Sequence, residues 1–213
     1  MIRGIATLIV VFFISGCTAM IQSQVTVFHE LELGPKTYAF LRLEDQQGSL
    51  EHRLYENSVR TKLAQYGLKE APLEDAEYAI FITYGIGSQQ VLKSYPIIGQ
   101  TGISSATTYG SATTYGNTGT YSGTTTYTPS YGVVGTSTYS TTEYTRYFNL
   151  TFFDKKYFDK HRELRSVYEG KVTSKGSTGE LSIVVPYLVE SLFQEFPGNS
   201  GSTRRVILPI NPQ

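Results

Sequence analysis

The sequence has 213 residues, which suggests one domain or slightly more, and its 18 basic and 18 acidic residues give a formal net charge of zero. A neutral chain is not typical of proteins that bind nucleic acid by releasing counter-ions. The single cysteine excludes a disulfide framework and a zinc finger, and three histidines leave little room for a metal site. We therefore expect a protein that binds no nucleic acid, no metal and no cofactor.

The first residues have the pattern of an export signal. Residues 1–3 make a short positive start, and residues 4–14 follow as an uncharged apolar run, GIATLIVVFFI. A helix of that length covers only about half of the ~30 Å that a bilayer requires. We therefore interpret residues 1–16 as a signal peptide and not as a membrane-spanning anchor.

Residues 14–17, Ile-Ser-Gly-Cys, resemble the bacterial lipobox. The resemblance implies cleavage after Gly16 and acylation of Cys17, so that acyl chains hold the protein on a membrane. Thr18 follows, and under the sorting rule of enteric-type bacteria a residue other than Asp implies the outer membrane, here on its periplasmic face. The alternative is an ordinary signal peptide with an incidental cysteine.

An uncharged segment divides the rest of the chain. Residues 94–142 contain no Asp, Glu, Lys or Arg and consist mostly of Thr, Ser, Gly and Tyr. The flanking segments carry every charge of the mature chain and are long enough for one hydrophobic core. We expect residues 17–93 and 143–213 to form a single α+β domain, with residues 94–142 as an insertion.

Before the insertion the pattern predicts two strands, a helix and a third strand. Residues 25–28 and 37–43 are rich in β-branched and aromatic side chains, and residues 78–86 are nearly all apolar, as in a central strand. Between them, Ser49 is a candidate N-cap and Gly67 a candidate C′ residue. The apolar residues of this predicted helix lie near one face: Leu50, Leu54, Val59, Leu63 and Tyr66.

After the insertion a second set of elements is expected. Residues 143–154 and 164–173 read as two strands of a hairpin, joined by a charged turn over 154–162. Residues 181–196 carry the strongest helical stripe in the chain, with Pro186 inside it, and residues 205–210 are a candidate edge strand. The expected fold is α+β, in the order ββαβ–insertion–ββαβ, with a mostly antiparallel sheet and two helices on one face.

Several short motifs outside the insertion occur in an order typical of a known family. They are Gly-Pro-Lys-Thr-Tyr-Ala-Phe at 34–40, Tyr-Gly-Leu at 66–68, Asp-Ala-Glu-Tyr at 75–78 and Phe-Gln-Glu-Phe-Pro at 193–197. Together with the lipobox they resemble the bacterial lipoprotein family named domain of unknown function four-one-three-six. The family often has Trp-x-Gly before its last helix, where this chain has Tyr168-Glu169-Gly170. The resemblance implies an exported lipoprotein of α+β fold and no catalytic residues.

The body offers little that points to an enzyme. His29-Glu30 matches the first two residues of the metalloprotease zinc-binding motif, but the second histidine of that motif is missing at position 33. We expect His52 and His161 to be solvated, and the acidic turn of Glu74, Asp75 and Glu77 to be a solvated loop. The sequence therefore predicts no catalytic activity.

The insertion contains four tyrosines spaced six residues apart and each preceded by Thr: Tyr109, Tyr115, Tyr121 and Tyr127. Because six is even, one extended strand would place all four rings on one side. Three interpretations remain open: a flexible low-complexity loop, a β-arm that binds a partner protein or copies of itself through 101–142, and a surface for glycan.

We therefore predict an outer-membrane lipoprotein that acts as a non-catalytic scaffold or binding module, as a subunit of an envelope assembly contacted through the insertion. The four tyrosines would bind the partner and Cys17 would bind the membrane. The alternative is a stand-alone periplasmic domain that binds or hydrolyses a ligand.

Overall fold

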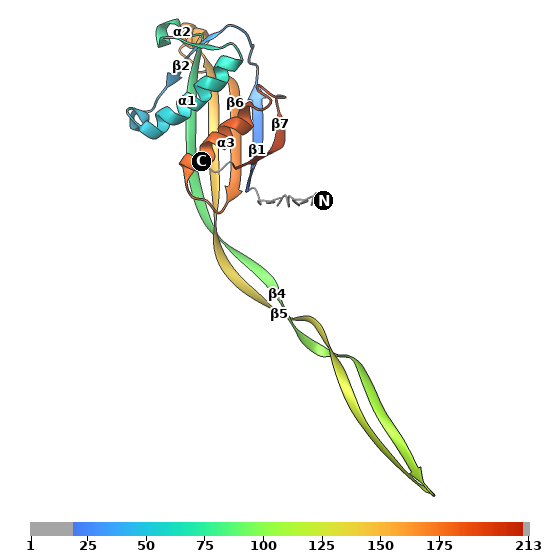
Figure 1. The fold of residues 1–213 in the computed structure, drawn as a ribbon. Helices are drawn as coiled ribbons and strands as arrows, with labels where there is room; N and C mark the ends of the chain where they lie inside the picture. Colours follow the sequence, from blue (N-terminus) through green and yellow to red (C-terminus); the bar gives the residue numbers. More distant parts are fainter. Residues whose placement is uncertain (1–18, 211–213) are drawn as a thin grey trace, which may run out of the picture. The chain divides into compact units, whose positions relative to one another are not determined.

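The computed structural model describes residues 19–210 (Figure 1). The chain divides into two compact units, one comprising Met1–Ser88 with Tyr144–Gln213, and the other Gln89–Glu143. We call the described part of the first unit the body and the second unit the hairpin. Within residues 19–210, no helix combines the length and the apolar character that crossing a membrane would demand.

The body is built on a mixed sheet whose strands lie in the order β3-β2-β4-β5-β6-β1-β7. The strands are β1 (Met20–His29), β2 (Thr37–Leu41), β3 (Lys69–Glu70), β4 (Tyr78–Tyr115), β5 (Thr118–Asp154), β6 (Ser166–Gly176) and β7 (Ser202–Pro209). β1 pairs antiparallel with β6 and β7, and β5 pairs antiparallel with β6. β2 is parallel to both β3 and β4. β4 and β5 continue from the sheet into the hairpin.

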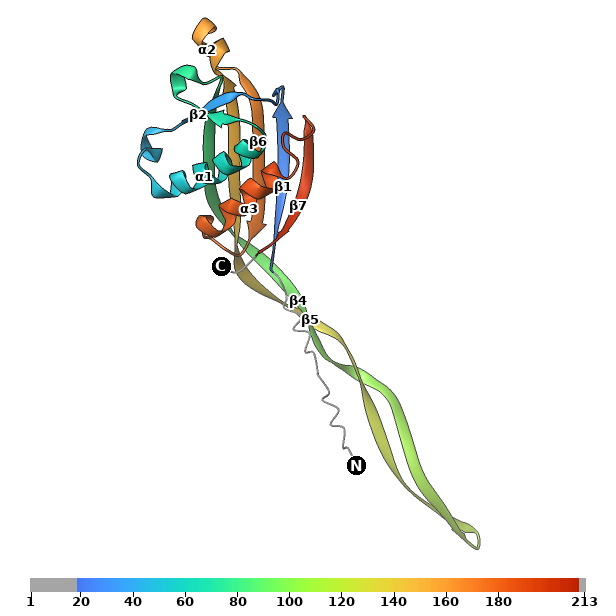
Figure 2. The ribbon, with the colours of Figure 1, turned by 45° about the horizontal axis from the view of Figure 1, so that its top comes forward.

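The described chain has three α-helices, α1 (Leu50–Gln65), α2 (Lys155–His161) and α3 (Leu181–Phe193). α1 begins where expected, because the Ser49 hydroxyl accepts a hydrogen bond from the His52 N–H at 3.2 Å. It ends before Gly67, whose φ of 82° is a left-handed conformation that glycine adopts readily. α1 and α3 lie across the same face of the sheet (Figure 2).

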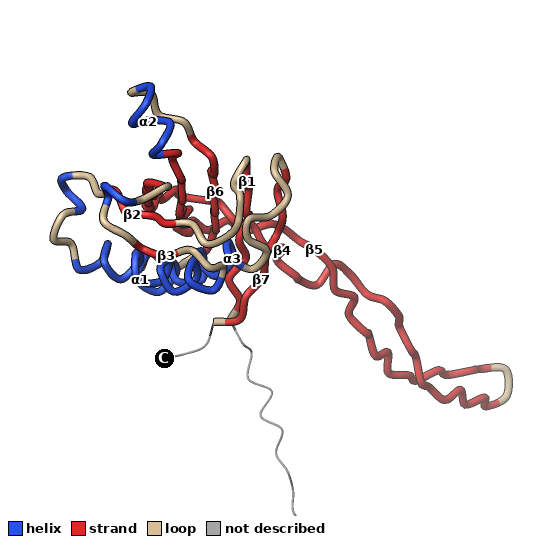
Figure 3. Tube along the Cα trace, turned by 90° about the horizontal axis from the view of Figure 1, so that it is seen from above, coloured by secondary structure: helices blue, strands red, loops and turns tan. Residues whose placement is uncertain are grey.

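The core lies between that sheet face and the two helices. β1 alternates strictly, with Ile21, Val25 and Val27 buried and Gln22 and Gln24 exposed. The stripe predicted on the last helix is buried as well: Val184, Val185, Leu188, Val189, Leu192 and Phe193. Figure 3 shows α1 and α3 together on one side of the body's sheet and α2, which follows β5, on the other side. We call the sheet face that is turned away from α1 and α3 the open face.

The expected arrangement of ββαβ–insertion–ββαβ with two helices is wrong. β2 and β4 are joined through α1, and such a crossover makes two strands parallel, so the sheet is mixed. The charged turn expected over 154–162 contains α2, because the Asp154 carboxylate accepts a hydrogen bond from the Tyr157 N–H at 2.9 Å and caps a helix there. The insertion expected at residues 94–142 lies within the second compact unit, Gln89–Glu143, and is formed by the continuations of β4 and β5.

Candidate functional site

The hairpin consists of β4 and β5 joined by a two-residue turn, Gly116-Asn117. Gly116 has a φ of 61°, which glycine adopts without steric cost and which two-residue hairpin turns require. Thr and Tyr favour strands, and cross-strand pairs of such residues stabilise a ribbon of this kind. The sequence therefore folds locally into a hairpin and not into a loose loop.

Side chains of the two strands contact one another along the length of the hairpin. The hydroxyls of Thr108 and Thr125 are 2.8 Å apart, and the Ser104 hydroxyl donates to the Thr128 carbonyl at 3.0 Å. Farther from the turn, the ring centroids of Tyr95 and Tyr139 are 6.1 Å apart. β4 and β5 are thus complementary in both hydroxyl and ring contacts.

The four predicted tyrosines all lie on the hairpin and are all exposed. Their exposed fractions are 75% for Tyr109, 92% for Tyr115, 63% for Tyr121 and 60% for Tyr127. The contact between Thr108 and Thr125 shows that even-numbered β4 residues share a face with odd-numbered β5 residues. Tyr109 and Tyr115 therefore lie on the face opposite to Tyr121 and Tyr127. The rings do not share one side as expected, because the chain turns between the second and the third of them.

Both outer edges of the hairpin are without a neighbouring strand. Among the described residues, β4 pairs with β2 only as far as Phe81, and β5 pairs with β6 only from Tyr144 onward. Between these points each strand has only the other as a neighbour. Lys93 and Glu143 are the only charged residues in Gln89–Glu143. The hairpin therefore presents two long strand edges with few charges, and exposed rings on both of its faces.

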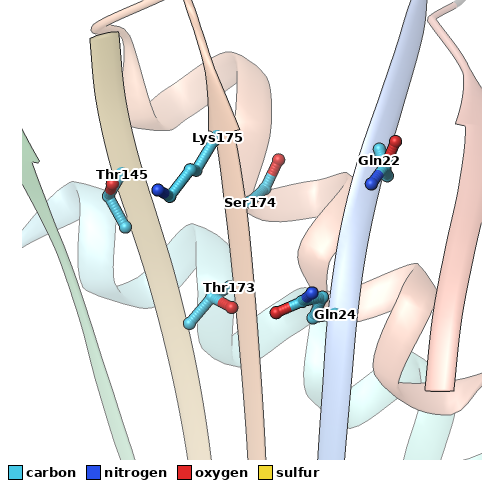
Figure 4. A pocket seen from close by; sticks show the side chains of 6 residues that line it. All are labelled: Gln22, Gln24, Thr145, Thr173, Ser174 and Lys175. Carbon is cyan, nitrogen blue, oxygen red and sulfur yellow. The ribbon is translucent and has the colours of Figure 1, made fainter. Parts of the chain in front are cut away.

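The open face of the body's sheet carries a shallow concavity of about 480 Å³ (Figure 4). Its lining residues come from β1, β5 and β6: Gln22, Gln24, Thr145, Thr173, Ser174 and Lys175. Amide, hydroxyl and ammonium groups at such a surface can hold a polar ligand. Sequence reasoning did not find this concavity, because outward polar residues that alternate with buried ones look like an ordinary solvated strand face.

An ionic cluster joins two buried residues of α1, His52 and Glu56, to the partly exposed Arg42. The Arg42 guanidinium donates two hydrogen bonds to the Glu56 carboxylate, at 2.7 and 2.6 Å, and His52 Nε2 lies 3.2 Å from the same carboxylate. The pKa of His52 is lowered mainly by burial, with the charge of Arg42 adding to the effect while Glu56 opposes it. His52 was expected to be solvated, and this is wrong, because both it and Glu56 are only 1% exposed. Burial at that level keeps substrates away, so the cluster serves the fold.

The remaining acidic and histidine candidates from the sequence show no arrangement of a metal site among the described residues. Glu77 accepts a hydrogen bond from Lys156 Nζ at 2.7 Å, which lowers the pKa of its carboxyl, whereas Glu74 and Asp75 are exposed as expected. His29 Nε2 lies 3.0 Å from the Gly198 carbonyl oxygen. Across residues 19–210, no three His, Cys, Asp or Glu side chains are grouped as metal ligands would be. Cys17, the predicted lipidation site, lies outside the described residues.

Comparisons with known proteins give one family and several distant folds. The sequence model described as Domain of unknown function (DUF4136) matches residues 34–198. No curated protein matches the sequence. A PDZ domain protein from Parabacteroides distasonis is similar at a TM-score of 0.47 and 11% identity, over 89% of this chain and 39% of that chain. Two PelC dodecamer structures from Paraburkholderia phytofirmans are similar at TM-scores of 0.36 and 0.34 and identities of 13% and 14%, each over 80% of this chain and 94% of that chain.

Proposed function

This chain belongs to the family described as Domain of unknown function (DUF4136), and from that premise we propose that it is a non-catalytic, lipid-anchored envelope protein whose hairpin binds a protein partner. In this proposal the body is the scaffold that carries the hairpin. Acyl chains on Cys17 would hold the protein at the outer membrane, facing the periplasm.

The observation that carries the proposal is the exposure of the hairpin. A two-stranded hairpin alone is marginally stable in water, and proteins usually protect long strand edges with charges, prolines or a covering element. This hairpin has only two charged residues, Lys93 and Glu143, both at the end away from its turn, and its four predicted tyrosines are 60–92% exposed. Tyrosine provides a large contact area at a low entropic cost, which suits it to a binding surface. A partner that covers the hairpin would account for both features.

The test is a pull-down of the tagged full chain from envelopes solubilised in mild detergent. Wild type is expected to retain a partner at fixed stoichiometry, and replacing Tyr109, Tyr115, Tyr121 and Tyr127 with Ser is expected to abolish that retention. The matched control replaces the preceding Thr108, Thr114, Thr120 and Thr126 with Ser, which keeps every ring in place. Equal retention of the same partner by the tyrosine variant would overturn the proposal.

A second candidate function is ligand binding on the open face of the body, which the concavity between β1, β5 and β6 favours. Its polar lining suits a hydroxyl-rich ligand such as a soluble peptidoglycan fragment. Calorimetry with such fragments should then show binding by wild type and a loss of binding when Gln24 and Thr173 are both replaced with Ala. Absence of binding by wild type would remove this candidate.

A further inference from the structure

We infer that the protein which covers the hairpin is a second copy of this chain, with the β4 edge of one copy paired to the β5 edge of the next. The inference rests on the proposed function, because it names the partner that the hairpin binds. It concerns the part of β4 beyond Phe81 and the part of β5 before Tyr144, where each strand has one free edge in the described structure.

Hydrogen bonding provides the first argument. In an antiparallel pair, roughly every second residue directs its N–H and C=O toward the partner strand, so the alternate residues direct theirs outward. Each edge of the hairpin is therefore a row of unused donors and acceptors. Any extended strand could pair with such a row, and another copy of the hairpin always brings one.

The contacts inside the hairpin show that these two particular strands fit one another. Thr101 and Ser130 place their hydroxyls 3.3 Å apart, and Thr108 and Thr125 place theirs 2.8 Å apart. The ring centroids of Tyr95 and Tyr139 are 6.1 Å apart. Pairing the outer edge of β4 with the outer edge of β5 from another copy brings the same two sequences together, again antiparallel. The second interface thus repeats a pairing chemistry that the chain already uses once.

Charge provides the third argument. Copies of a protein carry the same charges, so a charged edge would repel itself, and lysine on an edge strand commonly prevents such pairing. Residues 94–142 have no charged side chain on either strand. Pro96 and Pro129 are the only prolines in Gln89–Glu143, and each removes one donor from its strand without ending it. No charge between 94 and 142 opposes contact between copies.

The direction of the strands favours pairing of the β4 edge of one copy with the β5 edge of another. Inside the hairpin, β4 and β5 are consecutive strands joined by a two-residue turn, so they run antiparallel, and a second interface that repeats this pairing must also be antiparallel. When two hairpins run side by side in the same direction, the β4 edge of one meets the β5 edge of the other antiparallel, whereas β4 against β4 would be parallel. The contact is therefore heterologous, so each copy uses both edges and further copies can be added.

Cysteine cross-linking in membranes tests this pairing directly. Cys17 is the only native cysteine, and the unaltered chain serves as the control for any reaction at that position. One copy carries Thr107→Cys on β4, and a differently tagged copy carries Thr125→Cys or Thr126→Cys on β5. The two β5 positions point to opposite faces, so one of them shares a face with Thr107 whichever way the copies meet.

A short bismaleimide should link the β4 variant to one of the two β5 variants, and each variant alone should give little product. A β4–β4 adduct as abundant as the β4–β5 adduct would overturn the heterologous contact. If no adduct forms while the pull-down still retains a different protein on the tyrosines, the partner is not a second copy, and the proposed function survives. If neither an adduct nor a retained protein is found, both fail.

Discussion

Replacing Arg42 with Met removes the partly exposed partner of the buried Glu56 carboxylate. Glu56 is 1% exposed, and Arg42 donates two hydrogen bonds of 2.7 and 2.6 Å to its carboxylate. Breaking a buried pair from one side typically costs about 3–5 kcal/mol, because an uncompensated charge remains. The Arg42 side chain is itself 41% exposed, so water can reach the vacated space and we expect the lower end, about 3 kcal/mol. For a chain of this size that is a fall in Tm of roughly 6–12 °C at pH 8.

The same variant should respond to pH in a characteristic way. In wild type the pKa of His52 is lowered, so its neutral form is favoured by folding and stability should fall as the pH drops through about 6.5. Removing Arg42 removes one of the causes of that lowering and leaves Glu56 beside the ring, so His52 should protonate more readily and compensate the carboxylate. The stability deficit of Arg42→Met relative to wild type should therefore shrink between pH 8 and pH 5.5.

Thermal unfolding followed by circular dichroism at several pH values measures both effects. The matched control is the double variant Arg42→Met/Glu56→Gln, which removes both charges and should show a smaller deficit at pH 8 that changes less with pH. The account of the Arg42–Glu56 ion pair would be refuted if Arg42→Met melted like wild type at pH 8. It would also be refuted if the stability deficit of Arg42→Met grew as the pH was lowered.

Three further predictions follow from the fold and the proposed anchor. Leu188→Ala should lower the free energy of unfolding by about 2–5 kcal/mol, because the Leu188 side chain is fully buried. Ile183→Ala, on the exposed side of α3, should lower it only slightly. Equal losses in denaturant titrations would contradict the assignment of the Leu188 side of α3 as the buried face. Excising residues 97–140 and closing the strands with a short turn should change body stability by only about 1 kcal/mol, and loss of cooperative unfolding would show that the body depends on the hairpin. Cys17→Ser should abolish incorporation of labelled fatty acid, and labelling that persists would exclude acylation at that residue.

Local signals in the sequence were sufficient for several elements. Ser49 and Gly67 bound the predicted helix within two residues of α1, since caps act through neighbouring backbone groups. The apolar stripe of α3 likewise predicted its buried face. The spacing of six is visible in the sequence and locates the four exposed tyrosines of the hairpin, whereas acylation of Cys17 stays a prediction.

Long-range partners were not visible in the same way. The sequence groups Leu50 and Leu54 on one face with Val59 and Leu63. Leu50 and Leu54 are nevertheless 74% and 50% exposed, whereas the polar residues His52 and Glu56 are buried. The Glu56 carboxylate can be buried because Arg42 donates two hydrogen bonds to it. Such a contact between residues far apart in the sequence leaves no local pattern. The parallel pairing of β2 with β4 and the division of the tyrosines between two faces are unpredictable for the same reason, since each depends on where the chain reverses.

Hydrogen exchange of the backbone amides in Gln89–Glu143 tests the central claim, that the hairpin is an ordered contact element whose edges are covered in the assembly. An isolated hairpin should protect about half of these amides, those that face the other strand. In the intact assembly, isolated in mild detergent, protection should extend to nearly all of them along both strands. Random-coil exchange across 101–142 in that assembly would contradict the account.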